Sequence, residues 1–152
     1  MKITLIAVGR LRKGPEKTLV DAYLDRFAKT GRGLGLPPVA LTEVEGRGAL
    51  SEADAIVRAL PDGAAVVMLD ERGQMLSSPD LASRLGAWRD QARDIAFVIG
   101  GADGLDAALR DRADLAISFG AMVWPHMLVR VMLTEQLYRA ASILAGSPYH
   151  RA

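Results

Sequence analysis

Three segments of the sequence hold residues whose types and spacing could do chemistry. The first is FVIGGADGL, in which Gly100, Gly101 and Gly104 follow an apolar run. Glycines at such a place allow a tight turn and let the backbone approach a ligand closely. The dinucleotide fingerprint requires G-x-G-x-x-G, whereas this segment offers G-G-x-x-G, so its spacing argues against that fingerprint. A strand-to-helix turn without any ligand explains the same glycines.

The second segment is the apolar loop FGAMVWP, which contains Gly120 and ends in Trp124 and Pro125. A loop of this kind can hold an adenine ring through apolar contacts and backbone hydrogen bonds, without a charged side chain. Trp124 also has a simpler explanation, because most tryptophans are packed in a core or an interface.

The third segment is the C-terminal tail SPYHRA. A C-terminus is usually variable and poorly ordered, yet this one carries Tyr149 and His150, one of only two histidines in the chain. Arg139 precedes the tail on a helical pattern, four residues after Glu135. An ion pair within the helix is the simplest explanation of Glu135, but less so of Arg139, which lies beside Tyr138. The sequence alone leaves open whether the tail is an end or part of a site.

The elements around these segments predict an α/β fold. Apolar runs predict strands at residues 2–9, 39–45, 64–70, 94–101 and 114–120. Helical patterns lie between them at 16–29, 52–60, 79–92 and 106–112, and a last one at 125–145; Ser51 and Ser78 are the expected caps of the second and third. Because the strands are apolar throughout and alternate with helices, we expect a mostly parallel sheet of five to six strands flanked by helices.

The candidate site follows from this architecture. In open parallel sheets, ligands bind beyond the carboxyl ends of the strands. Three loops meet this condition, namely the one after Leu69, the one at Gly100 and Gly101, and residues 120–125. The last helical pattern is apolar on most of its surface, which favours burial in a core or in a dimer interface.

Composition narrows the class of protein. The 152 residues suit a single domain, spanning 1–152, and the absence of cysteine excludes disulfides and thiolate metal sites. Two histidines that lie 24 positions apart make no metal motif, so no metal is expected. The sequence has neither a signal peptide nor an unbroken apolar span, which favours a soluble cytoplasmic protein without a membrane partner.

Charge gives a local signal only. The net charge is +1, from 19 basic and 18 acidic residues, so the chain as a whole has no strong attraction to nucleic acid. Basic residues nevertheless gather near the N-terminus, and they form either a solvated edge or a patch that binds phosphates: Lys2, Arg10, Arg12, Lys13 and Lys17.

Taken together, FVIGGADGL, WPHMLVRVMLTEQLYRAASIL and PYHR resemble the RlmH family of small SPOUT-class methyltransferases. AVGR near the N-terminus and LDERGQMLSS match as well, so the resemblance spans essentially the whole chain. It implies a fold with a C-terminal trefoil knot, a homodimer and S-adenosyl-L-methionine as methyl donor. The implied reaction is methylation of N3 of a pseudouridine in 23S ribosomal RNA of the large subunit, on assembled ribosomes and not on DNA.

The resemblance also implies roles for individual residues. Arg139 and His150 are the candidates for stabilising the anionic base and taking its N3 proton, and Tyr149 for stacking on the base. The implied cofactor contacts are Leu69, Gly101, Gly120, Ala121, Met122, Val123, Trp124 and Pro125. Because these candidates come from both the tail and the loops, the resemblance suggests a site composed of two subunits.

Two other classes of function stay open at this stage. The chain could be an α/β module that binds a nucleotide or flavin without transferring a methyl group. It could also be a non-catalytic factor that binds ribosomes. Binding of S-adenosyl-L-methionine but not of NAD or FMN, together with methyl transfer, separates the methyltransferase from both.

Overall fold

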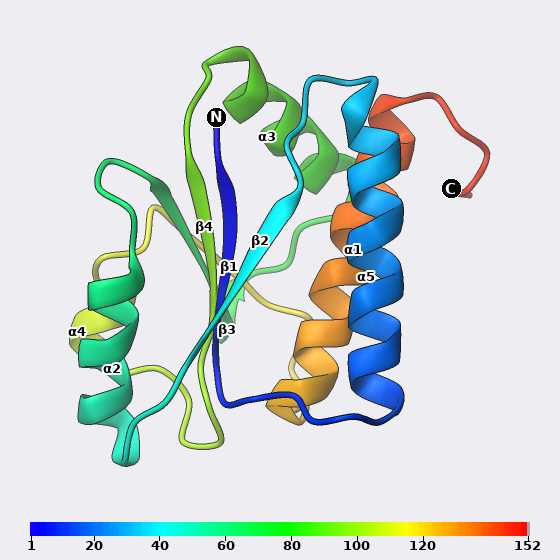
Figure 1. Ribbon diagram of the computed structural model, residues 1–152. Coiled ribbons are helices and arrows are strands. Elements are labelled where there is room, and N and C mark those ends of the chain that lie inside the picture. Colours follow the sequence, from blue (N-terminus) through cyan, green and yellow to red (C-terminus); the bar gives the residue numbers. More distant parts are fainter. Residues whose placement is uncertain (152) are drawn as a thin grey trace.

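The computed structural model describes residues 1–151, apart from the side chains of residues 48–50, as a parallel sheet between two layers of helices (Figure 1). The five strands are all parallel and lie in the order β2-β1-β4-β3-β5. Their bounds are β1 Ile3–Val8, β2 Val39–Val44, β3 Ala65–Gln74, β4 Ile95–Ile99 and β5 Leu115–Ile117. The predicted α/β architecture with a parallel sheet is confirmed.

The helices are divided between the two faces of the sheet (Figure 1). α1 (Pro15–Arg32), α3 (Ser78–Asp90) and α5 (His126–Leu144) cover one face, where α5 packs against both of the others. α2 (Gly48–Ala59) and the short α4 (Ala107–Arg110) cover the other face. The strands run downward in Figure 1 and α5 runs upward, so its first turn lies near the carboxyl ends of the strands.

The alternation of side chains along each strand explains why helices pack on both faces of the sheet. Leu5 and Phe97 face α1, α3 and α5, whereas their neighbours Ile6 and Val98 face α2 and α4, and all four are fully buried. Since successive side chains of a strand point to opposite faces, an unbroken apolar run buries both faces of the sheet. The continuous runs in the sequence therefore predict the layered arrangement.

Two helix starts differ from the predicted ones. Ser77, not Ser78, caps α3, because its hydroxyl accepts a hydrogen bond from the backbone N–H of Asp80 at 3.2 Å. α2 begins at Gly48 with Arg47 in the capping position, so Ser51 lies inside the helix. This earlier start places Glu52 on the buried side of α2, next to Ala53 and Ile56.

β3 is longer than predicted and makes an excursion at its end. Residues 71–74 were expected in a loop, but β3 continues to Gln74, and Ile117 of β5 pairs with both Leu69 and Gln74. The intervening residues bulge away from the ladder. Gly73 makes this possible, because a Cβ there would lie 2.6 Å from the backbone carbonyl of Ala116. The close approach fixes the carboxyl end of β3 against β5.

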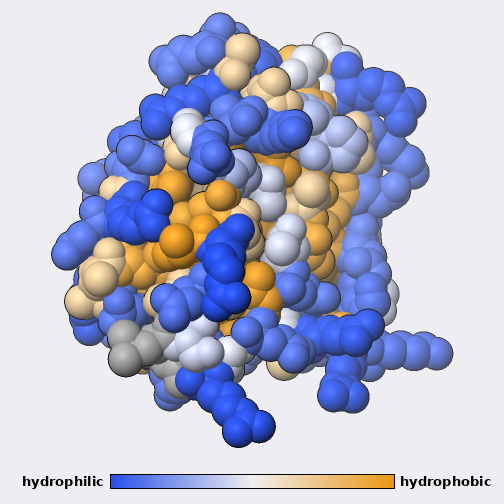
Figure 2. All heavy atoms as spheres, turned by 60° about the vertical axis from the view of Figure 1, so that its left-hand side comes forward, coloured by the Kyte–Doolittle hydropathy of each residue, from blue (hydrophilic) through white to orange (hydrophobic). Residues whose placement is uncertain are grey.

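Hydrophobic side chains also remain on the surface. Figure 2 shows them in the middle of one face, surrounded by hydrophilic residues. The exposed apolar residues include a group at the start of α5 and just before it: Met122, Val123, Trp124, Met127 and Leu128. Within the described part of the chain, no helix combines the length and hydrophobicity needed to cross a bilayer.

Candidate functional site

A pocket of about 310 Å³ lies at the carboxyl ends of β3, β4 and β5. The three loops nominated from the sequence meet there, together with the start of α5. The predicted residues that line the pocket are Leu69, Gly101, Gly120, Met122, Val123 and Trp124. Ala121 and Pro125 belong to the same loop but do not line the pocket, and Pro125 instead caps α5 through its carbonyl oxygen.

One wall of the pocket is the turn from Gly100 to Gly104 after β4. The N–H of Gly104 donates to the carbonyl of Gly101 at 3.0 Å, which closes the turn. A Cβ on Gly101 would lie 2.8 Å from Glu52 Oε2 and 3.0 Å from a methyl group of Val8. The close packing behind the pocket therefore favours glycine at position 101, and so does the access of a ligand to the pocket.

Replacing Gly101 by alanine is expected to weaken binding of a ligand in the pocket by about threefold to tenfold, because either the Glu52 carboxylate and Val8 or the turn itself must shift. Calorimetric titration of S-adenosyl-L-methionine measures this effect. Gly33→Ala is the matched control, since Gly33 has a helical φ of −77° and a Cβ there would meet no described atom within 4 Å. Equal affinities of the two variants would contradict the prediction.

Glu52 is a buried acid that the sequence analysis did not single out. Its side chain lies behind Gly101, and its Oε2 atom has no hydrogen-bond partner among the described residues. Burial and the nearby carboxylate of Asp103 raise the pKa of Glu52, while His126 acts in the opposite direction. The glutamate could have been found from its i,i+4 spacing to the inward-facing Ile56.

Charged groups form the rim of the same pocket. Asp70, at the end of β3, faces Arg110 of α4 with 3.5 Å between carboxylate and guanidinium. Arg110 also donates to the carbonyl of Leu105 at 2.8 Å, which ties α4 to the glycine turn. The pocket thus combines an apolar wall from the loop before α5 with a polar rim. Arg110 was missed because its partner lies 40 positions away in the sequence.

The three predicted catalytic residues come together at the other end of α5. The guanidinium of Arg139 donates to Glu135 at 2.6 Å and lies 4.8 Å from the centre of the Tyr149 ring. Tyr149 donates its hydroxyl proton to the same Glu135 oxygen at 3.0 Å, and Arg139 approaches Nδ1 of His150 at 3.3 Å. The tail is therefore held against α5, and the expected ion pair between Glu135 and Arg139 is also present.

Electrostatics reinforce this tail cluster, which we define as Glu135, Arg139, Tyr149 and His150. Burial and the hydrogen bond to Glu135 raise the pKa of Tyr149 to about 12, so its phenol stays protonated and remains a donor at neutral pH. The hydrogen bond that Arg139 itself donates to Glu135 raises the pKa of Arg139. The cluster thus presents a fixed cation beside an imidazole.

The tail cluster and the pocket are far apart within one chain. His126 lines the pocket in the first turn of α5, whereas Arg139 lies 13 residues further along the helix. At 1.5 Å per residue the separation along the axis is about 20 Å. Figure 1 shows the tail and the start of α5 at opposite ends of the molecule. One chain alone does not bring its predicted catalytic residues to its predicted cofactor pocket.

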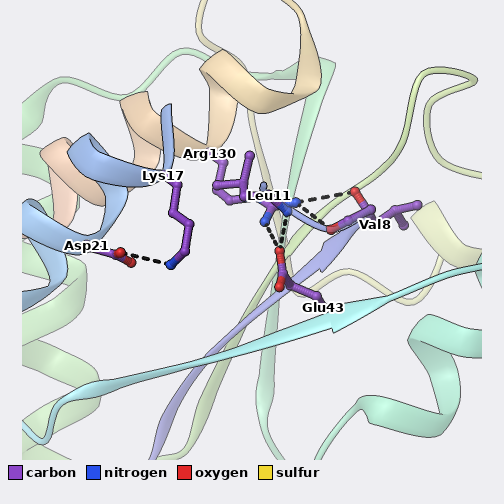
Figure 3. A network of polar contacts seen from close by, with 7 residues as sticks. Val8, Leu11, Lys17, Asp21, Glu43 and Arg130 are labelled. Carbon is purple, nitrogen blue, oxygen red and sulfur yellow. Dashed lines mark hydrogen bonds and ion pairs between the residues drawn. The ribbon is translucent and has the colours of Figure 1, made fainter. Parts of the chain in front are cut away.

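Arg130 connects the start of α5 to the sheet (Figure 3). Its side chain is 1% exposed, and it donates to Glu43 of β2 at 2.6 Å and to the carbonyl of Gly9 at 2.9 Å. Burial alone would raise the pKa of Glu43, but the N–H of Leu11 and the charge of Arg130 outweigh it and lower the pKa. The sequence places Arg130 on a stripe of α5 but gives no indication of this partner.

Comparison with known proteins identifies the family of this chain. A family model described as "Predicted SPOUT methyltransferase" matches residues 1–150. The chain belongs to the SPOUT methyltransferase family. Within it, the expected relation to RlmH is confirmed: Ribosomal RNA large subunit methyltransferase H of Paracoccus denitrificans is 69% identical, with 99% of each chain covered. The protein of that name from Cereibacter sphaeroides is 68% identical over the same shares.

A solved structure shares the fold of this chain. A structure described as a "probable methylase family protein" from Haemophilus influenzae superposes with a TM-score of 0.54 at 12% sequence identity. The match covers 99% of this chain and 70% of the other. At that identity the likeness supports the fold alone.

Proposed function

We propose that this SPOUT protein transfers a methyl group from S-adenosyl-L-methionine to N3 of a pseudouridine in 23S ribosomal RNA of the large subunit, on assembled ribosomes in the cytoplasm. The observation that carries the proposal is the full-length identity of 69% with a ribosomal RNA large subunit methyltransferase H. The pocket and the tail cluster supply the two parts that such a reaction needs, a place for the methyl donor and a group of side chains for the base.

The residues of the pocket fit the methyl donor. Met122, Val123 and Trp124 form an apolar wall suited to an adenine ring, and the glycine turn leaves backbone groups accessible. The carboxylate of Asp103 at the rim suits the amino group of the methionine part. When bound, this cofactor supplies an electrophilic methyl group on a sulfonium. The proposed reaction includes no metal.

The tail cluster supports roles for Arg139, His150 and Tyr149 at the base. An N3–H group is a poor nucleophile, so the base must lose this proton and its carbonyl oxygens must carry the resulting charge. The guanidinium of Arg139 stabilises that charge. The ring of Tyr149, held by Glu135, offers a surface for stacking.

The contact between Arg139 and His150 determines how the proton can move. A guanidinium only donates, so Nδ1 of His150 accepts in this contact and the neutral imidazole carries its proton on Nε2. Nδ1 is therefore the nitrogen able to take the N3 proton, once the incoming base separates His150 from Arg139. Separation frees both groups at the same time, the arginine for the carbonyl oxygen and the imidazole for the proton.

The proposed active unit is a homodimer. The separation of about 20 Å between pocket and tail cluster is bridged when a second copy contributes its tail. The exposed apolar residues at the start of α5, Trp124 among them, supply a surface for this contact close to the pocket. Ala121 and Pro125 then act by shaping the loop that carries the lining residues.

The proposal includes a C-terminal trefoil knot within a single domain of residues 1–152. β5 pairs with β3 on both sides of the excursion at residues 70–73, and the end of that excursion lies against Ala116. These contacts hold the loop at the end of β3 against the strand that leads into α5. They support a knot in which the last segment threads through such a loop.

Incubating ribosomes with labelled S-adenosyl-L-methionine tests the proposed function. We expect label at N3 of one pseudouridine of 23S RNA, and much less in ribosomes that lack the pseudouridine. Mapping the modified nucleotide by mass spectrometry identifies the position. Ribosome binding without label would favour a non-catalytic factor, and binding of NAD or FMN in place of the methyl donor would favour a nucleotide-binding module.

A further inference from the structure

A second hollow lies on the same edge of the sheet as the pocket. It is formed by the segment after β1, the first turns of α1 and the end of β2: Arg10, Leu11, Arg12, Lys13, Lys17, Val20, Asp21, Leu41 and Glu43. We call it the basic hollow. Since β1 and β3 are separated only by β4, it lies about 10 Å from the part of the pocket built by β3.

Some charged side chains of the basic hollow are held in ion pairs and others are not. Lys17 is paired with Asp21 at 2.9 Å, and Glu43 is neutralised by Arg130 (Figure 3). Arg10, Arg12 and Lys13 are exposed, and in the part of the chain that the structure describes they form no ion pair. Three adjacent cations are therefore available to an anion from outside.

The backbone beneath these cations is fixed. Arg130 donates to the carbonyl of Gly9, and the N–H of Leu11 donates to Glu43 at 2.7 Å, so both residues beside Arg10 are held. The same segment lies near the pocket, because a Cβ added to Gly9 would come within 3.6 Å of the ring of His126, which lines the pocket. The buried arginine thus holds the basic hollow in a constant position relative to the pocket.

We propose that the basic hollow binds backbone phosphates of the RNA strand whose target base lies at the pocket. This inference rests on the proposed function and names a contact of the same site. An RNA strand is the occupant that the observations favour, because the hollow offers unpaired cations and lies at the same edge of the sheet as the pocket, where the ends of β1 and β3 are about two strand spacings apart. It assigns a function to the basic residues that the sequence left undecided.

Replacing Arg10, Arg12 and Lys13 together by glutamine tests the proposal. Equilibrium binding to purified large subunits is measured over a series of salt concentrations. Each phosphate contact contributes about 0.7 to 0.9 to the slope of log K against log salt, so we expect the slope to fall by about two to three. Affinity at low salt is expected to fall about tenfold or more, while the affinity for S-adenosyl-L-methionine stays unchanged.

A matched control removes the same charge elsewhere. Arg32, Arg84 and Arg112 are exposed and lie outside both the basic hollow and the pocket, and their joint replacement by glutamine also lowers the net charge by three. We expect this variant to keep the wild-type slope. Equal slopes for the hollow variant and the wild type, or equal losses in both variants, would overturn the proposal.

A failure of the basic-hollow proposal can be distinguished from a failure of the proposed function. If the slope of the hollow variant falls below that of the wild type as expected, but the wild type transfers no methyl group, the basic hollow stands and the methyl-transfer proposal fails. If the wild type methylates ribosomes and the hollow variant binds them with an unchanged slope, the proposed function stands and the basic hollow fails.

Discussion

The Arg139→Ala variant is expected to methylate ribosomes at least about 100 times more slowly than the wild type. The guanidinium is held by Glu135 beside His150 and the Tyr149 ring, so its position is fixed before the base arrives. Removal of one preorganised group that stabilises a developing negative charge typically costs a factor of 10² to 10³ in rate. Incorporation of labelled methyl groups into ribosomes, at saturating cofactor, measures the effect.

Three comparisons separate this role from a structural one. Arg139→Lys keeps the charge but loses the planar donors, so we expect it to recover only part of the rate. Arg26→Ala removes another cation that lies against an aromatic ring of α5, since Arg26 lies 5.9 Å from the Tyr138 ring. This variant should leave the rate nearly unchanged. Cofactor affinity and mass in solution should be those of the wild type in all three variants. A normal rate for Arg139→Ala would refute its proposed role.

The sequence predicts the fold and the pocket because both depend on local patterns. An apolar run such as Ala96–Ile99 identifies a strand buried on both faces, and parallel strands bring their carboxyl ends to one edge. The loops after Leu69, Gly101 and Gly120 therefore had to meet, and the structure brings them together. No contact between distant residues was needed for this step.

Other features depend on pairs that no local pattern identifies. Arg130 and Glu43 lie 87 positions apart, and either one alone has the pattern of an ordinary surface charge. The extension of β3 to Gln74 depends on the close approach of Gly73 to Ala116. The distance from pocket to tail cluster depends on the length and direction of α5. The family resemblance identified the tail residues, but the structure alone gives their separation from the pocket.

The Arg130→Met variant is expected to lose about 2 to 4 kcal/mol of unfolding free energy. Methionine fills much of the space, but Glu43 loses its partner and the carbonyls of Val8 and Gly9 lose a donor. Arg130 is fully buried but 27% of the Glu43 side chain is exposed, so the carboxylate left behind loses its closest partner while staying partly solvated, and the cost is smaller than for a fully buried pair. Lys17→Met, which breaks an exposed pair with Asp21, is the control and should cost at most about 1 kcal/mol. Urea denaturation at pH 7 measures both.

The pH dependence of these free energies distinguishes loss of the ion pair from loss of packing. In the wild type the pKa of Glu43 lies below its ordinary value of 4.5, so its contribution is present above that value and is lost as the pH falls through the lowered pKa. Arg130→Met lacks the part of this contribution that Arg130 supplies, while the hydrogen bond from the Leu11 N–H remains, so its deficit should shrink between pH 7 and pH 3. A deficit that stays constant over this range would mean that Arg130 stabilises the protein through packing alone. If Arg130 acts through packing alone, the Arg130→Met/Glu43→Leu double variant should be no more stable than Arg130→Met. If Arg130 acts through the ion pair, the double variant should regain part of the lost unfolding free energy, because the uncompensated carboxylate is gone.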